Sequence, residues 1–236
     1  MIDKDKSYWI NRPVFLKFKD RFDFKKFERV RELKKVFLTE RIVEMPFVID
    51  ALQGIDKKYK VLDVGCSESS LPLHMSSLGY DVTGIDIRDY PYKMPNFNFL
   101  KADIMNLPFE DGDFDAVTCV STLEHVGLGF YSDPKEKDEP QKKAVKEMDR
   151  VLKKGGLFIL TVPFGVPSVN DQQRVFDQKG VDDILEGFKI IRIKYFANFE
   201  QEEARNNYWR GVDIGFAEKV ISDASTQCIC CVSAQK

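Results

Sequence analysis

Three acidic side chains lie where short apolar runs of the sequence end, and this spacing can serve ligand chemistry. The acids are Asp63, Asp86 and Asp103, and the runs are residues 60–64, 81–86 and 97–101. If the runs are parallel strands, their carboxyl ends meet at one edge of a sheet, where ligands bind. There Asp86 can accept both hydroxyls of a ribose, and Asp103 can accept the amino proton of an adenine. Singly, each acid is better explained as a loop acid or helix cap, but the three together predict a nucleotide-like ligand.

A tight turn of small residues follows the first of these runs. Gly65 and Ser67 lie where the backbone must turn sharply and let a ligand approach closely. Gly65 alone would indicate only a turn. Ser67 can hydrogen-bond a ligand carboxylate, while Ile87 and Ile104 follow the second and third acids and Ile104 can pack on an aromatic ring. We therefore expect the turn and the acids to form one ligand site.

A glutamate–histidine pair follows another apolar run, residues 116–120, and suits acid–base chemistry. The pKa range of histidine fits a general base, so we expect His125 to accept a proton from a substrate hydroxyl. Glu124 can orient His125 or hold an ammonium group, and Ser121 begins the same segment. The alternative is a structural His125 hydrogen-bonded at a helix start, the role that we expect for His74.

A long, polar, turn-rich segment, residues 127–140, follows that pair. A loop of this length at the ligand edge is typical of a substrate lid, and a disordered insertion is the alternative. Tyr131 and Asp133 within it can contact a polyhydroxylated substrate. Arg174 lies in a later segment that is predicted to face the same edge. These three side chains are our candidates for substrate contact.

Short apolar runs alternate with helical periodicity along residues 57–236, which predicts an α/β fold with a mainly parallel sheet. Seven strands are expected, at residues 60–64, 81–86, 97–101, 116–120, 157–162, 189–196 and 226–234. Helices at 69–78 and 141–152 would cover the sheet in a Rossmann-like three-layer sandwich with one antiparallel strand. Residues 1–56 carry apolar side chains at helical spacing and predict an N-terminal helical arm or cap.

Composition indicates a soluble globular protein without a general affinity for nucleic acid. Lys and Arg number 36 against 38 Asp and Glu, and the formal net charge is -2. No run reaches the roughly 18 apolar residues of a membrane-spanning helix, and the charged N-terminus does not resemble a secretory signal. The 5 cysteines are irregularly spaced, as in reduced intracellular proteins, so we expect a cytoplasmic location.

Three of the cysteines, Cys228, Cys230 and Cys231, form a cluster that can suggest a metal site. Their apolar neighbours are typical of a buried strand, and only 2 histidines are available to complete a metal site. We therefore expect a strand here and no metal.

Taken together, the motifs over residues 61–163 resemble the class I methyltransferase family. The first motif of that family is matched by residues 62–66, its second strand by 79–86, its third motif by 103–109 and its closing helix–turn–strand by 150–157. The resemblance implies S-adenosylmethionine as the cofactor and S-adenosylhomocysteine as the product. It assigns to the cofactor Asp63, Gly65, Ser67, Asp86, Ile87, Asp103, Ile104 and Ser121. It assigns His125 and Glu124 to the catalytic step.

One departure from the family pattern bears on cofactor binding. The family usually has glycines where this chain has Ser67 and Ser69. Serine is small enough for a close approach, so we interpret the change as an adaptation; a fold that no longer binds the cofactor is the alternative. A nicotinamide dinucleotide is disfavoured, because its pyrophosphate requires the Gly-x-Gly-x-x-Gly turn and this loop keeps only Gly65.

The acceptor is predicted from a looser resemblance. Residues 121–128, 161–165 and 174–177 resemble a methyltransferase subgroup associated with sugar or surface-polysaccharide modification. We therefore expect O-methylation of a small-molecule or sugar hydroxyl. RNA or protein methylation is an alternative, because residues 15–27 can grip a nucleic-acid backbone or form an amphipathic helix. The metal site of small-RNA 3′-end methyltransferases cannot form, because Ser121 replaces a required Glu.

A non-catalytic scaffold that keeps the methyltransferase fold is a third reading of the sequence. It would bind no cofactor, whereas an enzyme acting on nucleic acid would show salt-dependent RNA affinity. The sequence does not determine the acceptor atom or the oligomeric state.

Overall fold

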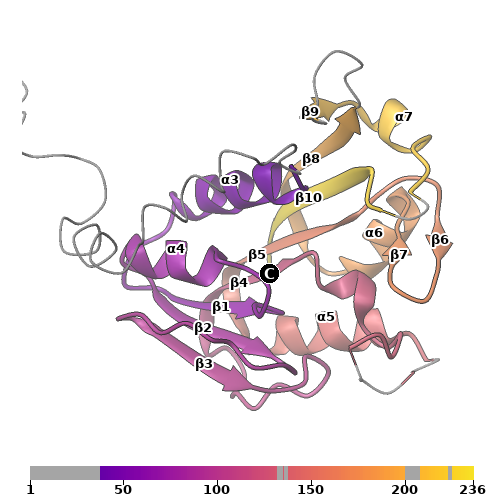
Figure 1. Ribbon diagram of the computed structural model, residues 1–236. Coiled ribbons are helices and arrows are strands. Elements are labelled where there is room, and N and C mark those ends of the chain that lie inside the picture. The colour runs from indigo at the N-terminus through magenta and orange to yellow at the C-terminus, as the bar shows by residue number, and fades with distance from the viewer. Residues whose placement is uncertain (1–37, 132–134, 136–137, 200–207, 223–224) are drawn as a thin grey trace, which may run out of the picture.

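The computed structural model describes residues 38–131, 135, 138–199, 208–222 and 225–236. Its main element is an eight-stranded sheet with the strand order β3-β2-β1-β4-β5-β10-β8-β9 (Figure 1). The strands are β1 (Lys60–Val64), β2 (Asp81–Asp86), β3 (Phe97–Lys101), β4 (Phe114–Val120), β5 (Leu152–Pro163), β8 (Lys189–Phe199), β9 (Tyr208–Val212) and β10 (Cys228–Gln235). A separate two-stranded sheet contains β6 (Ser168–Val169) and β7 (Arg174–Val175).

The first five strands in the chain pair parallel to one another, as predicted. From β1 the chain builds outward through β2 to β3, and it then returns to place β4 on the other side of β1. This reversal opens a crevice at the carboxyl ends of β1 and β4, the place where open α/β sheets bind their ligands. The topology therefore puts the predicted site at this edge of the sheet.

The Rossmann-like α/β fold is confirmed, and the strand count differs from our prediction by one. β10 is antiparallel to both of its neighbours, and the additional strand β9 pairs antiparallel with β8 at the edge of the sheet. The sequence of β9, Tyr-Trp-Arg-Gly-Val, contains no buried residue. An edge strand packs against a single neighbour and so carries little of the hydrophobic pattern by which strands are predicted.

Helices cover both faces of the sheet and complete the predicted three-layer sandwich (Figure 1). They are α3 (Arg41–Leu52), α4 (Leu71–Ser77), α5 (Pro140–Val151), α6 (Gln178–Ile184), α7 (Ile214–Ala217) and the 3-10 helix η1 (Leu123–His125). α3 and α4 pack on one face, while α5 and α6 pack on the other. The site residues after β1, β2 and β4 therefore lie on loops held between these two helical layers.

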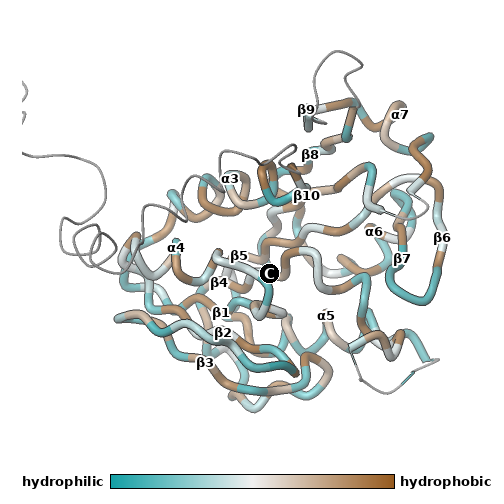
Figure 2. Tube along the Cα trace, viewed as in Figure 1, coloured by the Kyte–Doolittle hydropathy of each residue, from teal (hydrophilic) through white to brown (hydrophobic). Residues whose placement is uncertain are grey.

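Two apolar cores separate the three layers, because successive side chains of a strand point to opposite faces. Val61 packs in the same cluster as Phe47 of α3 and Met75 of α4, whereas the next residue, Leu62, packs with Met148 of α5. Apolar residues accordingly follow the central strands of the sheet (brown in Figure 2). Both faces of these strands are buried, which explains why they read as continuous apolar runs.

The predicted N-terminal arm is described only from residue 38 onward, so residues 15–27 lie outside the described residues. Its described helix, α3, is part of the sheet packing. Phe47, Val48 and Leu52 are buried in one cluster with Val61 of β1. This packing brings the polar side chains of α3 close to the ligand edge.

The cysteine cluster lies where the sequence indicated. Cys228, Cys230 and Cys231 are buried free thiols in β10, which confirms the predicted strand. In the described part of the chain, no three His, Cys, Asp or Glu side chains are grouped so as to hold a metal ion. Among the same residues, no helix is both long enough and apolar enough to cross a membrane.

Candidate functional site

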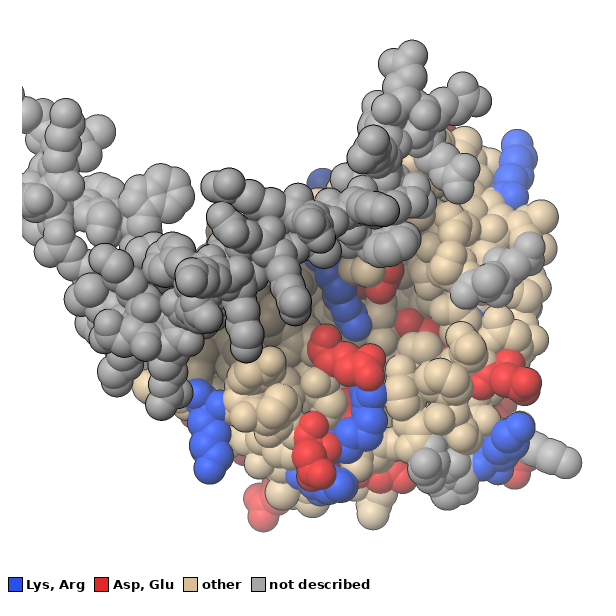
Figure 3. Space-filling model, in the orientation of Figure 1, with Lys and Arg blue, Asp and Glu red and all other residues tan. Residues whose placement is uncertain are grey.

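A cavity of about 600 Å³ lies at the carboxyl ends of β1, β2 and β4. The predicted site residues that line it are Gly65, Asp86, Ile87, Asp103, Ile104, Ser121, Glu124, His125 and Tyr131. Asp63, Ser67 and Arg174 are not among its lining residues, and Asp133 lies outside the described residues. Figure 3 shows acidic and basic side chains alternating beside a recess on this face of the molecule. The fold thus brings most of the predicted site together.

Gly65 forms the tight turn after β1, and its position accepts no side chain. Its φ is +78°, in the left-handed region that favours glycine. A Cβ at this position would lie 2.2 Å from the side chain of Thr122, so Thr122 fills the space beside the turn. The backbone of Gly65 itself lines the cavity and leaves room for a ligand.

Asp63 lies in β1 just before this turn and is buried. Its Oδ1 accepts a hydrogen bond of 2.6 Å from Thr118, whereas Oδ2 is buried without a partner among the described residues. Burial raises the pKa of Asp63 to about 7. A buried polar atom without a partner is uncommon and indicates an unfilled hydrogen-bonding position. This position lies next to the turn that faces the cavity.

Asp86 ends β2 and accepts hydrogen bonds from two backbone N–H groups. They come from Ser67, 3.0 Å from Oδ2, and from Arg88, 2.8 Å from Oδ1. The Arg88 side chain also pairs with Asp86, with 3.2 Å between Nε and Oδ1. The hydroxyl of Ser67 donates to the carbonyl of Arg88 over 3.5 Å. Sequence reasoning missed Arg88, although it lies only two residues after the acid.

Asp103 follows β3 at the far end of the cavity. Its Oδ1 accepts a hydrogen bond of 2.8 Å from the backbone of Met105, so the carboxylate also shapes its own turn. Ala102, Ile104 and Met105 line the cavity beside it. This end of the cavity therefore combines an acceptor carboxylate with apolar side chains, as a purine ring requires.

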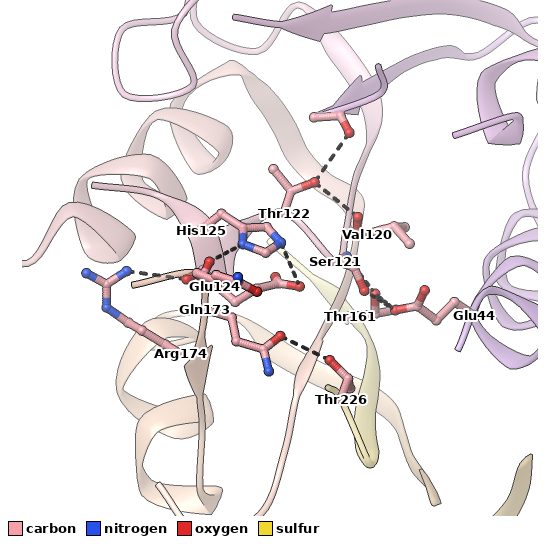
Figure 4. Close-up of polar contacts among 12 residues, drawn as sticks. Glu44, Val120, Ser121, Thr122, Glu124, His125, Thr161, Gln173, Arg174 and Thr226 are labelled. Carbon is pink, nitrogen blue, oxygen red and sulfur yellow. Dashed lines mark hydrogen bonds and ion pairs between the residues drawn. The ribbon is translucent and has the colours of Figure 1, made fainter. Parts of the chain in front are cut away.

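His125 ends η1, and a single hydrogen bond decides which of its ring nitrogens carries a proton. Nδ1 lies 2.5 Å from the carbonyl oxygen of Gln172, which can only accept, so Nδ1 donates and Nε2 keeps its lone pair (Figure 4). Nε2 lies 3.8 Å from Oε1 of Glu124. Burial lowers the pKa of His125, which keeps the ring neutral and Nε2 available as a base.

Glu124 lines the cavity beside the ring, although its side chain is almost fully buried. Burial raises the pKa of Glu124 to about 8, so the carboxyl group is mostly protonated near neutral pH. Its Oε2 is buried without a hydrogen-bond partner among the described residues. A neutral, unsatisfied carboxyl group of this kind can donate a hydrogen bond to a bound ligand.

Helix α3 contributes two site residues that sequence reasoning missed. Glu44 is fully buried, and its Oε1 accepts hydrogen bonds of 2.6 Å from Ser121 and from Thr161. Its Oε2 lies 3.2 Å from Nη1 of Arg41, which also donates to the carbonyl of Val120 over 3.2 Å. Arg41 lines the cavity. α3 is thereby joined to the ends of β4 and β5.

The contact with Glu44 also explains an unusual backbone conformation. Ser121 has a φ of +41°, which a residue other than glycine adopts only where its surroundings hold it. Its N–H donates to Oγ1 of Thr161 over 3.0 Å, and its hydroxyl donates to Glu44. A sequence signal for Glu44 did exist, since it lies on the same helical side as Phe47 and Val48.

Gln173 and Thr226 line the cavity together with Glu124 and His125, and we call this part of the cavity the acceptor end. The side chains of Gln173 and Thr226 hydrogen-bond over 3.1 Å. Arg174, a predicted substrate contact, is placed differently. Its guanidinium donates to the carbonyl of Val126 over 2.7 Å and so supports the backbone that follows η1. Tyr131 does line the cavity, and its ring meets that of His125 edge-on at 5.4 Å.

Comparison with known proteins shows which family the central part of the chain resembles. Residues 62–160 match the model of a methyltransferase domain family. A demethylmenaquinone methyltransferase from Staphylococcus aureus is 35% identical over 118 residues, which cover 45% of this chain and 44% of that protein. A ubiquinone biosynthesis O-methyltransferase from Colwellia psychrerythraea is 30% identical over 114 residues, covering 44% of this chain and 46% of that protein. The chain thus matches less than half the length of these relatives.

Solved structures share the fold over most of the chain. A 1,6-didemethyltoxoflavin-N1-methyltransferase from Burkholderia thailandensis, solved with S-adenosylhomocysteine, has a TM-score of 0.57 at 14% identity, and the match covers 100% of this chain and 97% of that one. A SAM-dependent methyltransferase from Methanosarcina mazei has a TM-score of 0.54 at 18% identity, covering 85% of this chain and 99% of that one. The chain therefore has the fold of these S-adenosylmethionine-dependent methyltransferases, and its residues 62–160 match a methyltransferase domain family.

Proposed function

We propose that this chain transfers the methyl group of S-adenosylmethionine to a hydroxyl of a small polar molecule, with His125 as the general base. The observation that carries the proposal is the hydrogen bond between Nδ1 of His125 and the carbonyl of Gln172. It leaves the basic lone pair on Nε2 of a neutral ring, in a side chain that lines the cavity.

The cavity residues fit this cofactor along its length. The backbone of Gly65 lines the cavity, so a ligand can approach the turn closely. In our proposal Asp86 accepts the two ribose hydroxyls, with Ile87 beside it, while Asp103 and Ile104 form the adenine end; all four residues line the cavity. When bound, the cofactor supplies a methyl group activated by its positively charged sulfur.

The amino-acid tail of the cofactor lies, in our proposal, at the other end of the cavity. Nη1 of Arg41 makes both of the hydrogen bonds described for this side chain, so Nε and Nη2 have no partner among the described residues. They are available to a carboxylate, the group that a guanidinium binds best. Asp63 carries the unsatisfied oxygen that an ammonium group requires. Arg41 and Asp63 together suit an amino acid, which carries one negative and one positive charge.

The chemical step then uses few protein groups. His125 would accept the hydroxyl proton at Nε2 as the hydroxyl oxygen takes the methyl group that S-adenosylmethionine would supply, with the neutral thioether as the leaving group. Glu124 stays protonated and donates a hydrogen bond, so no negative charge competes for the proton. Positioning of the two reactants accounts for the rest of the rate enhancement.

The acceptor that we propose is a polyhydroxylated compound such as a sugar. The polar side chains of Gln173, Thr226 and Tyr131 support this choice, because they line the acceptor end of the cavity. A second candidate is an aromatic hydroxyl. Two observations favour it, the rings of Phe130 and Tyr131 beside His125 and the quinone substrates named for the matched relatives.

The test is a binding measurement followed by a substrate panel. Calorimetry of the purified chain should detect S-adenosylhomocysteine, and activity should appear with sugar hydroxyls rather than with phenols or RNA. Activity with phenols alone would favour the aromatic candidate. A chain that binds neither S-adenosylmethionine nor its product would refute the enzyme altogether. We also propose a cytoplasmic location, which the free, buried thiols support.

A further inference from the structure

The carboxylate of Asp86 has no acceptor position left for a ribose in this structure. A carboxylate offers about four acceptor positions. The backbone N–H groups of Ser67 and Arg88 take two of them, as the turn geometry requires. The Arg88 guanidinium faces the other two, with 3.2 Å between Nε and Oδ1 and 3.5 Å between Nη2 and Oδ2. The side chain of Asp86 is only 5% exposed, so water has little access to it.

The guanidinium of Arg88 has two further contacts that do not involve Asp86. Its Nη1 lies 2.6 Å from Oε1 of Glu68, and its central carbon lies 4.0 Å from the centroid of the Tyr131 ring. Glu68, Arg88 and Tyr131 come from three different loops, and all three line the cavity. The Arg88 guanidinium can therefore leave Asp86 and still contact Glu68 and Tyr131 at the cavity wall.

We propose that Arg88 is an internal competitor of the cofactor, occupying the two Asp86 positions that the ribose hydroxyls need. The inference rests on the proposed cofactor-binding function. Binding of the cofactor requires the guanidinium to rotate off Asp86 while it keeps Glu68 and the ring of Tyr131. The backbone bonds from Ser67 and Arg88 to Asp86 are unaffected by this rotation.

The exchange opposes binding because the two sets of hydrogen bonds differ in strength. Bonds from a guanidinium to a carboxylate join two opposite charges, whereas a ribose hydroxyl is a neutral donor, so the bonds from the guanidinium are the stronger ones. The ribose therefore replaces a stronger pair of bonds by a weaker one, and part of the binding free energy is lost in the exchange. Retention of Glu68 and Tyr131 keeps this loss moderate.

The test measures affinity for S-adenosylhomocysteine by calorimetry in the full chain and in Arg88→Met. We expect the variant to bind about tenfold more tightly, since the ribose then no longer has to displace an ion pair from Asp86. Arg88→Ala should also bind more tightly, which would exclude a new contact from the methionine side chain. The Ala variant also serves as the test should the Met variant not fold. Equal or weaker binding by the folded variants would overturn the proposal.

Arg192→Met is a matched control. Arg192 is 30% exposed, against 31% for Arg88, and it likewise pairs with an acid, Asp50, and lies over an aromatic ring, Phe47. It does not line the cavity, so its substitution should leave the affinity unchanged. A wild-type chain that binds no S-adenosylhomocysteine would refute the proposed function. Wild-type binding that Arg88→Met and Arg88→Ala fail to strengthen would refute only the competition.

Discussion

The two ends of the cavity hold their charges in different ways. At the adenosine end, Asp86 pairs with Arg88, which reaches the cavity wall and is 31% exposed. At the acceptor end, Glu44 and Glu124 are buried, and burial raises the pKa of both. The first end can exchange one ionic partner for another when a ligand arrives. The second holds its carboxyl groups buried in fixed positions, and that of Glu124 is mostly protonated near neutral pH.

The largest effect that the acceptor end should show is on turnover. Replacing His125→Ala removes the base and should lower kcat by about 100-fold or more, because a positioned base contributes roughly that much. Affinity for S-adenosylhomocysteine should stay near that of the wild type. His74→Ala is the control, since His74 lies on α4 and does not line the cavity. Wild-type turnover in His125→Ala would remove the base from the mechanism.

At the adenosine end, the largest effect should be on binding. Asp86→Ala removes the acceptor for the ribose hydroxyls and should weaken S-adenosylhomocysteine binding by about 30-fold, a loss of about 2 kcal/mol. Calorimetry measures this directly. Asp89→Ala, an exposed acid on the same loop, should bind as the wild type does. Unchanged affinity in Asp86→Ala would place the ribose elsewhere.

A smaller effect on binding should distinguish the amino-acid tail of the cofactor from its adenosine. Arg41→Gln should weaken binding of S-adenosylhomocysteine about tenfold, by loss of the bond to its carboxylate. Binding of 5′-methylthioadenosine should not change, because that molecule has the adenosine and sulfur but no amino-acid tail. An equal loss for both ligands would mean that Arg41 acts only by holding α3 in place through Glu44.

The smallest effect concerns stability and pH. The pKa of Glu124 is raised from 4.5 to about 8 by burial, so between these values the unfolded chain has released a proton that the folded chain keeps. The free energy of unfolding should therefore fall as the pH rises from about 4.5 to about 8. Denaturant unfolding should show Glu124→Gln gaining about 1 kcal/mol on the wild type for each pH unit across that range.

An exposed glutamate provides the control for the Glu124 prediction. Glu186 is exposed on the surface, so Glu186→Gln should follow the pH dependence of the wild type. A constant difference between Glu124→Gln and the wild type would show that Glu124 is already ionised in the folded chain. The acceptor end would then carry a charge, and the contrast between the two ends would disappear.

The strands that carry the adenosine end were predictable with their observed bounds. β1, β2 and β3 each form a short run bounded by charged or polar residues, and the three acids lie in the last residues of these runs or just beyond them. Their site depends on contacts close in sequence, such as that between Ser67 and Asp86. The edge strand β9 was missed, because its half-covered position leaves little apolar pattern in the sequence.

The sequence by itself determined the parallel sheet, the turn at Gly65 and the acids at the strand ends, because apolar periodicity and local turn geometry act over a few residues. Only the tertiary structure decided which residues come together at the acceptor end of the cavity. Glu44 meets Thr161 across 117 positions of the chain, and His125 meets Gln172 across 47. Contacts over such separations depend on how the helices pack on the sheet, and side-chain spacing along the chain carries no record of that packing.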